Sequence, residues 1–107
     1  MKRADLERLH EIARLRSFRS QAELGKADAR VRSIQSAIAL TFPQEQAEPT
    51  DVHSARDRAC WQSWAELERR RLTMELSRLR AEQEPLRKSA GRDLARAEVL
   101  EKILKAK

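Results

Sequence analysis

The stretch that decides the fold runs from Trp61 to Leu104 and reads WQSWAELERRRLTMELSRLRAEQEPLRKSAGRDLARAEVLEKIL. Apolar residues recur in it every three or four positions, which is the spacing of one face of an α-helix. These residues are Trp61, Ala65, Leu72, Leu76, Leu79, Leu86, Ala90, Ala97 and Leu104. A long apolar stripe must be covered, so the stretch predicts a long helix that packs against a second helix.

The composition favours long helices over a thick globular core. Of the 107 residues, 37% are charged, 40% are hydrophobic and only 4% are aromatic. A chain so poor in large apolar side chains cannot build a core several layers deep. Glycine, proline and strand-forming residues are also scarce. We therefore predict an all-α chain that forms a single domain over residues 1–107.

A second helical pattern precedes the first stretch and covers residues 2–42. Its apolar residues lie within one helical sector and are Leu6, Leu9, Ala13, Leu24, Ala27, Val31, Ile34, Ile38 and Phe42. Pro43 should end this helix, because a residue before proline avoids the α conformation. We expect a polar loop over residues 43–50 and a helix over residues 51–106, with Thr50 or Asp51 as its N-cap.

Pro85 lies inside the second predicted helix. The apolar stripe continues in phase on both sides of it, which favours one helix with a kink at Pro85. The alternative is a break between Arg80 and Leu86, which would produce three helices.

Two long helices joined by a short loop must run antiparallel, so we predict an antiparallel coiled-coil hairpin whose second helix is the longer. A turn centred in the loop places Val31 near Trp61 and Leu6 near Leu86, with Trp61 in the core. In this pairing, the chain after about residue 92 extends past the first helix. This predicted overhang carries Val99, Leu100 and Ile103, which are candidate contacts with a second copy of the chain or with another protein.

Two further apolar faces are candidate docking surfaces. Leu15 and Phe18 lie nearly opposite the main stripe of the first helix; they indicate either a drifting seam or a docking face for another protein. Trp64, Leu67 and Met74 form a second face on the later helix. That face indicates either packing in an oligomer or a partner-binding patch.

The sequence contains no convincing catalytic or metal-binding set. His53, Asp57 and Cys60 share one face of a helix, and such a set can bind zinc or activate a thiol. However, Cys60 is the only cysteine, and His10 should lie far away. There is also no Gly-rich phosphate loop and no Ser/His/Asp set. We therefore predict no metal or cofactor and no enzymatic activity.

The charge is basic but mixed. A net charge of +6 arises from 23 basic and 17 acidic residues whose signs alternate along the chain, as on a solvated helix face. The run Arg69-Arg70-Arg71 fans out around a helix and cannot face one groove, so we expect solvated, ion-paired side chains there. Nucleic acid is thus a less favoured partner, and a purely structural, self-assembling coiled coil is a further alternative.

The longest apolar run, Ala37 to Leu40, is far too short to span a bilayer, and no signal-type region follows Met1. These features predict a soluble, cytoplasmic protein without membrane insertion. The single cysteine agrees with a reducing compartment.

Two segments carry a resemblance to a known family. LERLHEIARL at Leu6–Leu15 and LARAEVLEKILK at Leu94–Lys105, on two basic helices with a polar connection, resemble the stalk component of bacterial type III export systems, the flagellar FliJ and injectisome YscO family. The resemblance implies a coiled coil that inserts into the central hole of the hexameric export ATPase. It also implies contacts with the export gate and export chaperones, at the periphery of a membrane-embedded export complex, and a mechanical and allosteric role.

Overall fold

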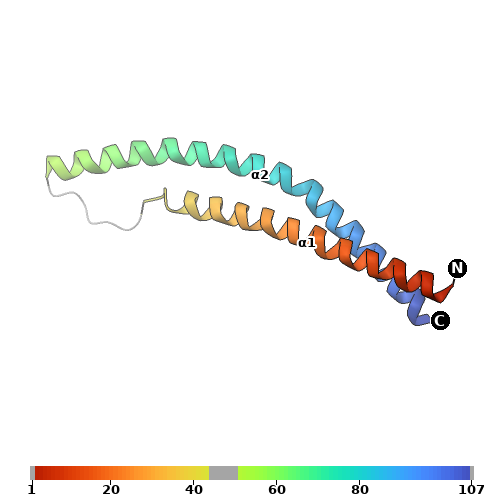
Figure 1. The fold of residues 1–107 in the computed structure, drawn as a ribbon. Coiled ribbons are helices and arrows are strands. Elements are labelled where there is room, and N and C mark those ends of the chain that lie inside the picture. The colour runs from red at the N-terminus through yellow and green to blue at the C-terminus, as the bar shows by residue number, and fades with distance from the viewer. Residues whose placement is uncertain (1, 44–50, 107) are drawn as a thin grey trace. The chain divides into compact units, whose positions relative to one another are not determined.

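The computed structural model describes residues 2–43 and 51–106, which form two α-helices. Helix α1 covers Arg3–Ala39 and helix α2 covers Val52–Ala106 (Figure 1). The two helices run antiparallel, and the described residues contain no strand. The predicted all-α hairpin with a longer second helix is therefore confirmed.

Helix α1 ends three residues earlier than predicted. The backbone N–H of Thr41 donates to the carbonyl oxygen of Ile38 (2.9 Å), and that of Phe42 donates to the carbonyl oxygen of Ala39 (3.3 Å). These tighter bonds replace the α-helical pattern and satisfy the last carbonyl groups. The Thr41 hydroxyl donates to the same Ile38 oxygen (2.6 Å), so a side chain competes with continuation of the helix.

Helix α2 begins with the predicted Asp51 cap. The backbone N–H of Ser54 donates to Oδ1 of Asp51 (2.7 Å), which satisfies one of the free N–H groups at the helix start. Thr50, the other predicted cap, lies outside the described residues. Helix α2 then continues through Pro85 without a break, so the three-helix alternative is wrong. The proline removes only one backbone hydrogen bond from a helix of 55 residues.

The Asp51 cap should make the first turn of α2 sensitive to acid. The hydrogen bond from the Ser54 backbone N–H lowers the pKa of Asp51 below its ordinary value. A carboxyl group whose pKa falls on folding stabilises the folded state at neutral pH, and this contribution disappears as the pH drops through the folded-state pKa, below about pH 4. We expect the NMR resonance of the Ser54 amide to shift as this turn frays below about pH 4. If the Ser54 amide resonance showed the same pH dependence in the Asp51→Ala variant, Asp51 would not be the group that makes this turn sensitive to acid.

Contacts divide the chain into two units. Unit 1 consists of Met1–Ala29 with Ala81–Lys107, and unit 2 consists of Arg30–Arg80. Each unit contains one segment of α1 and one segment of α2.

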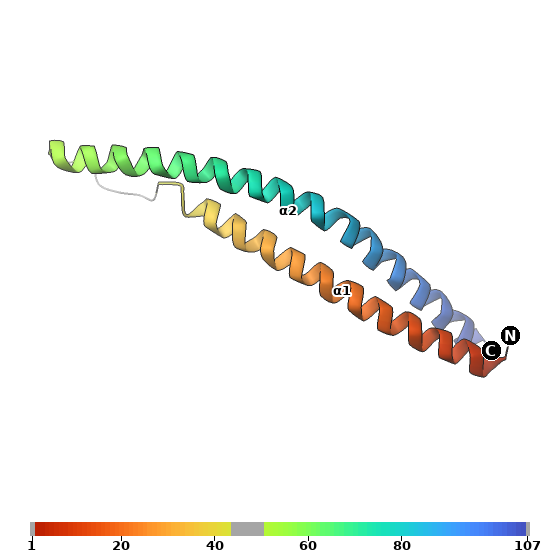
Figure 2. The same cartoon turned by 45° about the horizontal axis from the view of Figure 1, so that its top comes forward.

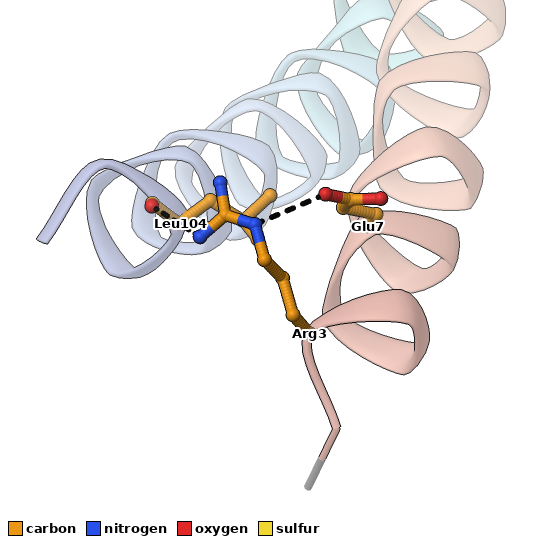
Figure 3. A network of polar contacts seen from close by, with 3 residues as sticks. All are labelled: Arg3, Glu7 and Leu104. Carbon is orange, nitrogen blue, oxygen red and sulfur yellow. Dashed lines mark hydrogen bonds and ion pairs between the residues drawn. The ribbon is translucent and has the colours of Figure 1, made fainter. Parts of the chain in front are cut away.

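Three polar contacts define the register of unit 1. Arg3 Nη1 donates to the backbone oxygen of Leu104 (3.4 Å), while Arg3 Nε pairs with Glu7 (Figure 3). Further along, the Ser20 hydroxyl donates to Asp93, and the Gln83 side-chain amide donates to Asp28. The N-terminal end of α1 and the C-terminal end of α2 accordingly lie side by side (Figure 2).

This register corrects the predicted pairing. Leu6 lies near the end of α2 rather than near Leu86, and the overhang predicted for residues after 92 does not exist, because that segment packs along α1. Ala97, expected on the overhang, is 7% exposed. The prediction considered only the length of the loop, whereas the side chains between the helices set the register of a coiled coil.

The seam of unit 1 is built largely from small and polar residues. Its most buried positions are Leu6, Ser17, Ala27, Gln83, Ala90 and Ala97. The Ser17 hydroxyl accepts a hydrogen bond from the Gln21 side-chain amide (3.1 Å). Among the described residues, no buried side-chain polar atom lacks a hydrogen-bond partner, so the seam avoids the cost of unsatisfied polar groups.

Unit 2 is held by aliphatic side chains and by Arg69. Its buried residues are Val31, Thr41, Ala65, Leu72 and Leu79. Arg69 Nη2 donates to the backbone oxygen of Thr41 (2.7 Å), and its guanidinium carbon lies 4.0 Å from the centroid of the Phe42 ring. A cation suits the C-terminal end of a helix, so Arg69 fastens the end of α1 to α2. The expectation of a solvated side chain is wrong for Arg69; Arg71, by contrast, pairs with Glu68 at the surface.

Trp61 is not a core residue. Its side chain is 37% exposed, and it lies two turns before Arg69, which marks the end of the α1 segment. In the described residues, Val52–Trp64 contains no fully buried side chain. The first turns of α2 are therefore the part of unit 2 that α1 leaves uncovered, and the predicted contact of Trp61 with Val31 is wrong.

Candidate functional site

An apolar groove in unit 1 is the strongest candidate for a functional site. We call it the terminal groove, because it lies between the N-terminal part of α1 and the C-terminal part of α2. Its volume is about 470 Å³. Its lining residues are Leu9, Ile12, Ala13, Arg16, Asp93, Ala95, Arg96, Val99 and Leu100.

Helical geometry explains why these residues form a groove. Leu6 and Ala13 point into the seam of α1, so Leu9 and Ile12 lie to one side of it. Ala97 points into the seam of α2, and Val99 lies to the side that meets Leu9 and Ile12. Each helix thus contributes apolar side chains that lie beside the seam and are not covered by the other helix.

The floor of the groove is apolar and open to solvent. Leu9, Ile12 and Val99 are 41%, 57% and 55% exposed. Clustered exposed aliphatic side chains are a mark of a protein-interaction surface, whereas single exposed ones are common.

Charged residues of the groove lie at one end and are mainly basic. Asp93 is only 12% exposed as a side chain, accepts a hydrogen bond from Ser20, and lies 3.9 Å from Arg96 Nη1. The Arg96 side chain is 63% exposed, and Arg16 is exposed as well. Because the acidic group points into the seam and the two guanidinium groups reach solvent, this end presents positive charge.

A second hollow lies on the other side of the same seam and is more polar. It is lined by His10, Arg14, Ser17, Phe18, Gln21, Leu94, Ala97, Glu98 and Glu101. The guanidinium carbon of Arg14 lies 5.9 Å from the centroid of the Phe18 ring. A hydrogen bond from Lys105 (3.0 Å between Nζ and Oε1) lowers the pKa of Glu101. Glu101 is paired with Lys105, and the lining also contains His10, Arg14 and Glu98, so this more polar side is a weaker candidate for binding an apolar ligand.

The structure separates the predicted contact residues. Val99 and Leu100 line the terminal groove, and Ile103 lies one turn beyond Val99 on α2 with 39% exposure. Phe18 lines the second hollow, and Leu15 is exposed but lines neither. The remaining three, all exposed in unit 2, are Trp64, Leu67 and Met74.

Sequence reasoning missed Leu9 and Ile12 as contact residues. Leu9 was assigned to the seam, and Ile12 was given no role beyond the family resemblance. A usable signal was present, because Leu6, Leu9, Ile12 and Ala13 are four apolar residues within about two turns, more than one coiled-coil seam needs.

The His53, Asp57 and Cys60 group remains at the surface. His53 Nε2 lies 3.7 Å from Asp57 Oδ2, and both side chains are largely exposed. Cys60 is also exposed. Within residues 2–43 and 51–106, no three His, Cys, Asp or Glu side chains lie close enough to hold a metal ion.

In the described ranges, neither helix has a stretch long and apolar enough to cross a membrane. Comparisons with protein-family models, curated proteins and solved structures find no match. The terminal groove is therefore the structural feature that bears most directly on function.

Proposed function

We propose that this chain is a non-enzymatic helical-hairpin adaptor that binds another protein through its terminal groove. The observation that carries this proposal is the exposed apolar cluster Leu9, Ile12 and Val99. Aliphatic side chains in a groove with a polar rim are typical anchors for a protein partner.

The partner we propose is a component of a bacterial type III export apparatus, with the hexameric export ATPase as the first candidate. The support is the resemblance of Leu6–Leu15 and Leu94–Lys105 to the export stalk family, since these two segments supply most of the groove. In this role the paired ends of α1 and α2 engage the ATPase, and the export gate and export chaperones are further partners. The hairpin then acts mechanically and allosterically, in the cytoplasm beside the export complex.

The substitution Ile12→Gln tests the proposal, with Leu15→Gln as a matched control. The two residues are on the same helix and are 57% and 61% exposed, but only Ile12 lines the groove. Losing one buried aliphatic anchor should weaken binding about tenfold. The measurement is the affinity of the intact chain for purified hexameric export ATPase, together with the ATP hydrolysis rate.

We expect Ile12→Gln to lose both effects and Leu15→Gln to retain them, with helicity unchanged in circular dichroism. Equal loss in the two variants, or no binding by the native chain, would contradict the export role. Binding to duplex DNA of random sequence that falls steeply with salt would instead support the nucleic-acid alternative.

A further inference from the structure

The terminal groove also indicates the chemistry of its ligand. We propose that it accepts one amphipathic helix of the partner protein, with acidic residues beside the apolar face of that helix. This inference rests on the proposed adaptor function and adds the class of the bound segment.

The shape of the groove favours a helix. The groove follows the gap between two antiparallel helices, and a third helix laid in it completes a three-helix bundle. From Leu9 to Arg16 the α1 flank covers about two turns, or about 10 Å. An extended peptide is a poorer ligand, because extended peptides bind by adding to a sheet edge or by docking on aromatic side chains. The described residues contain no strand, and the lining of the groove contains no aromatic residue.

The width of the apolar floor sets the pattern of anchors. Leu9 and Ile12 form the α1 side of this floor and Val99 forms the α2 side, so a ligand helix must bury side chains against both helices. Residues at positions i, i+3 or i+4 and i+7 of a helix form such a stripe. Two turns of contact therefore call for about three apolar anchors.

The charge at one end of the groove favours an acidic partner. Arg16 and Arg96 reach solvent there, whereas Asp93 is largely buried, accepts a hydrogen bond from Ser20 and lies 3.9 Å from Arg96 Nη1. Two arginines and one aspartate leave the lining with an excess of one positive charge. Carboxylates flanking the apolar face of a ligand helix would meet these guanidinium groups at the rim. A second copy of this chain is a poorer occupant, because each copy carries a net charge of +6.

The test is a selection from displayed helical peptides on the intact native chain. The apolar positions of the library are Leu, Ile, Val or Ala, and the flanking positions are drawn equally from Glu, Lys, Gln and Ser. We expect the enriched peptides to carry an excess of Glu at the flanks. The affinity of an enriched peptide, measured by fluorescence anisotropy, should fall about tenfold with Ile12→Gln and stay unchanged with Leu15→Gln.

The double variant Arg16→Glu with Arg96→Glu tests the charge separately. Selection on this variant should replace the excess of Glu by an excess of Lys, while circular dichroism shows an intact hairpin. No enrichment, enrichment without a charge bias, or binding that is insensitive to Ile12→Gln would overturn the proposal. A dimer in sedimentation that Ile12→Gln abolishes would overturn it too, since it would assign the groove to a second copy.

The outcomes separate this inference from the export role. Selection of acidic helices without capture of the export ATPase would remove the export role and leave the inference intact. Capture of the ATPase that depends on Ile12, without any preference for acidic peptides, would remove the inference alone.

Discussion

Replacing Leu72 by alanine should lower the free energy of unfolding by about 2–4 kcal/mol. Leu72 is 6% exposed and belongs to the apolar seam of unit 2. The seam is only one layer of side chains thick, so the neighbours cannot collapse fully into the space that the leucine leaves. The total stability of a domain is about 5–15 kcal/mol, and this loss is a large part of it.

The measurement is urea denaturation followed by far-ultraviolet circular dichroism. Met74→Ala is the control, because Met74 is on the same helix two positions later and is 75% exposed. We expect this substitution to change the free energy of unfolding by less than about 0.5 kcal/mol. Equal destabilisation by the two substitutions would show that Leu72 is no more buried than Met74, and the seam of unit 2 would then be assigned to the wrong face of α2.

Replacing Ala97 by leucine should lower the free energy of unfolding by about 1–3 kcal/mol. Ala97 is 7% exposed in the seam of unit 1, where a larger side chain pushes the helices apart. The same substitution on a free overhang would cost almost nothing, since alanine and leucine are both good helix formers. The experiment therefore tests the register directly.

Ala22→Leu is the control for this second substitution. Ala22 is exposed on α1 in unit 1, so a leucine there should leave the melting temperature nearly unchanged. If Ala97→Leu left the stability unchanged, the C-terminal part of α2 would be an unpaired overhang, and the register described here would be wrong. A loss confined to Ala97→Leu would support the register described by Ser20 with Asp93 and Arg3 with Leu104.

Local features of the fold were predictable because they depend on neighbouring residues. The helical periodicity, the Asp51 cap and the passage of α2 through Pro85 follow from backbone hydrogen bonding and from spacing along the chain. The end of α1 was misplaced by three residues, because Thr41 and Phe42 close the helix with tighter turns that the apolar pattern does not reveal.

The candidate site was only half predictable. The sequence predicts Val99 and Leu100 as contact residues because it places them on an overhang, and that reason is wrong. In the structure Val99 is exposed and Leu100 is half-buried, and both lie beside the seam between α1 and α2. Leu9 and Ile12 were not predicted as contact residues, because an apolar residue close to a helix seam cannot be distinguished from a core residue until the position of the seam is known.

The sequence by itself determined two long helices, their approximate ends and their antiparallel direction, because these follow from local hydrogen bonds, periodicity and a short connection. The tertiary structure alone decided the register within each unit, because that register depends on pairs such as Ser20 with Asp93 and Thr41 with Arg69, which are far apart in the chain. The terminal groove follows from the register, because only this pairing brings Leu9 and Ile12 beside Val99.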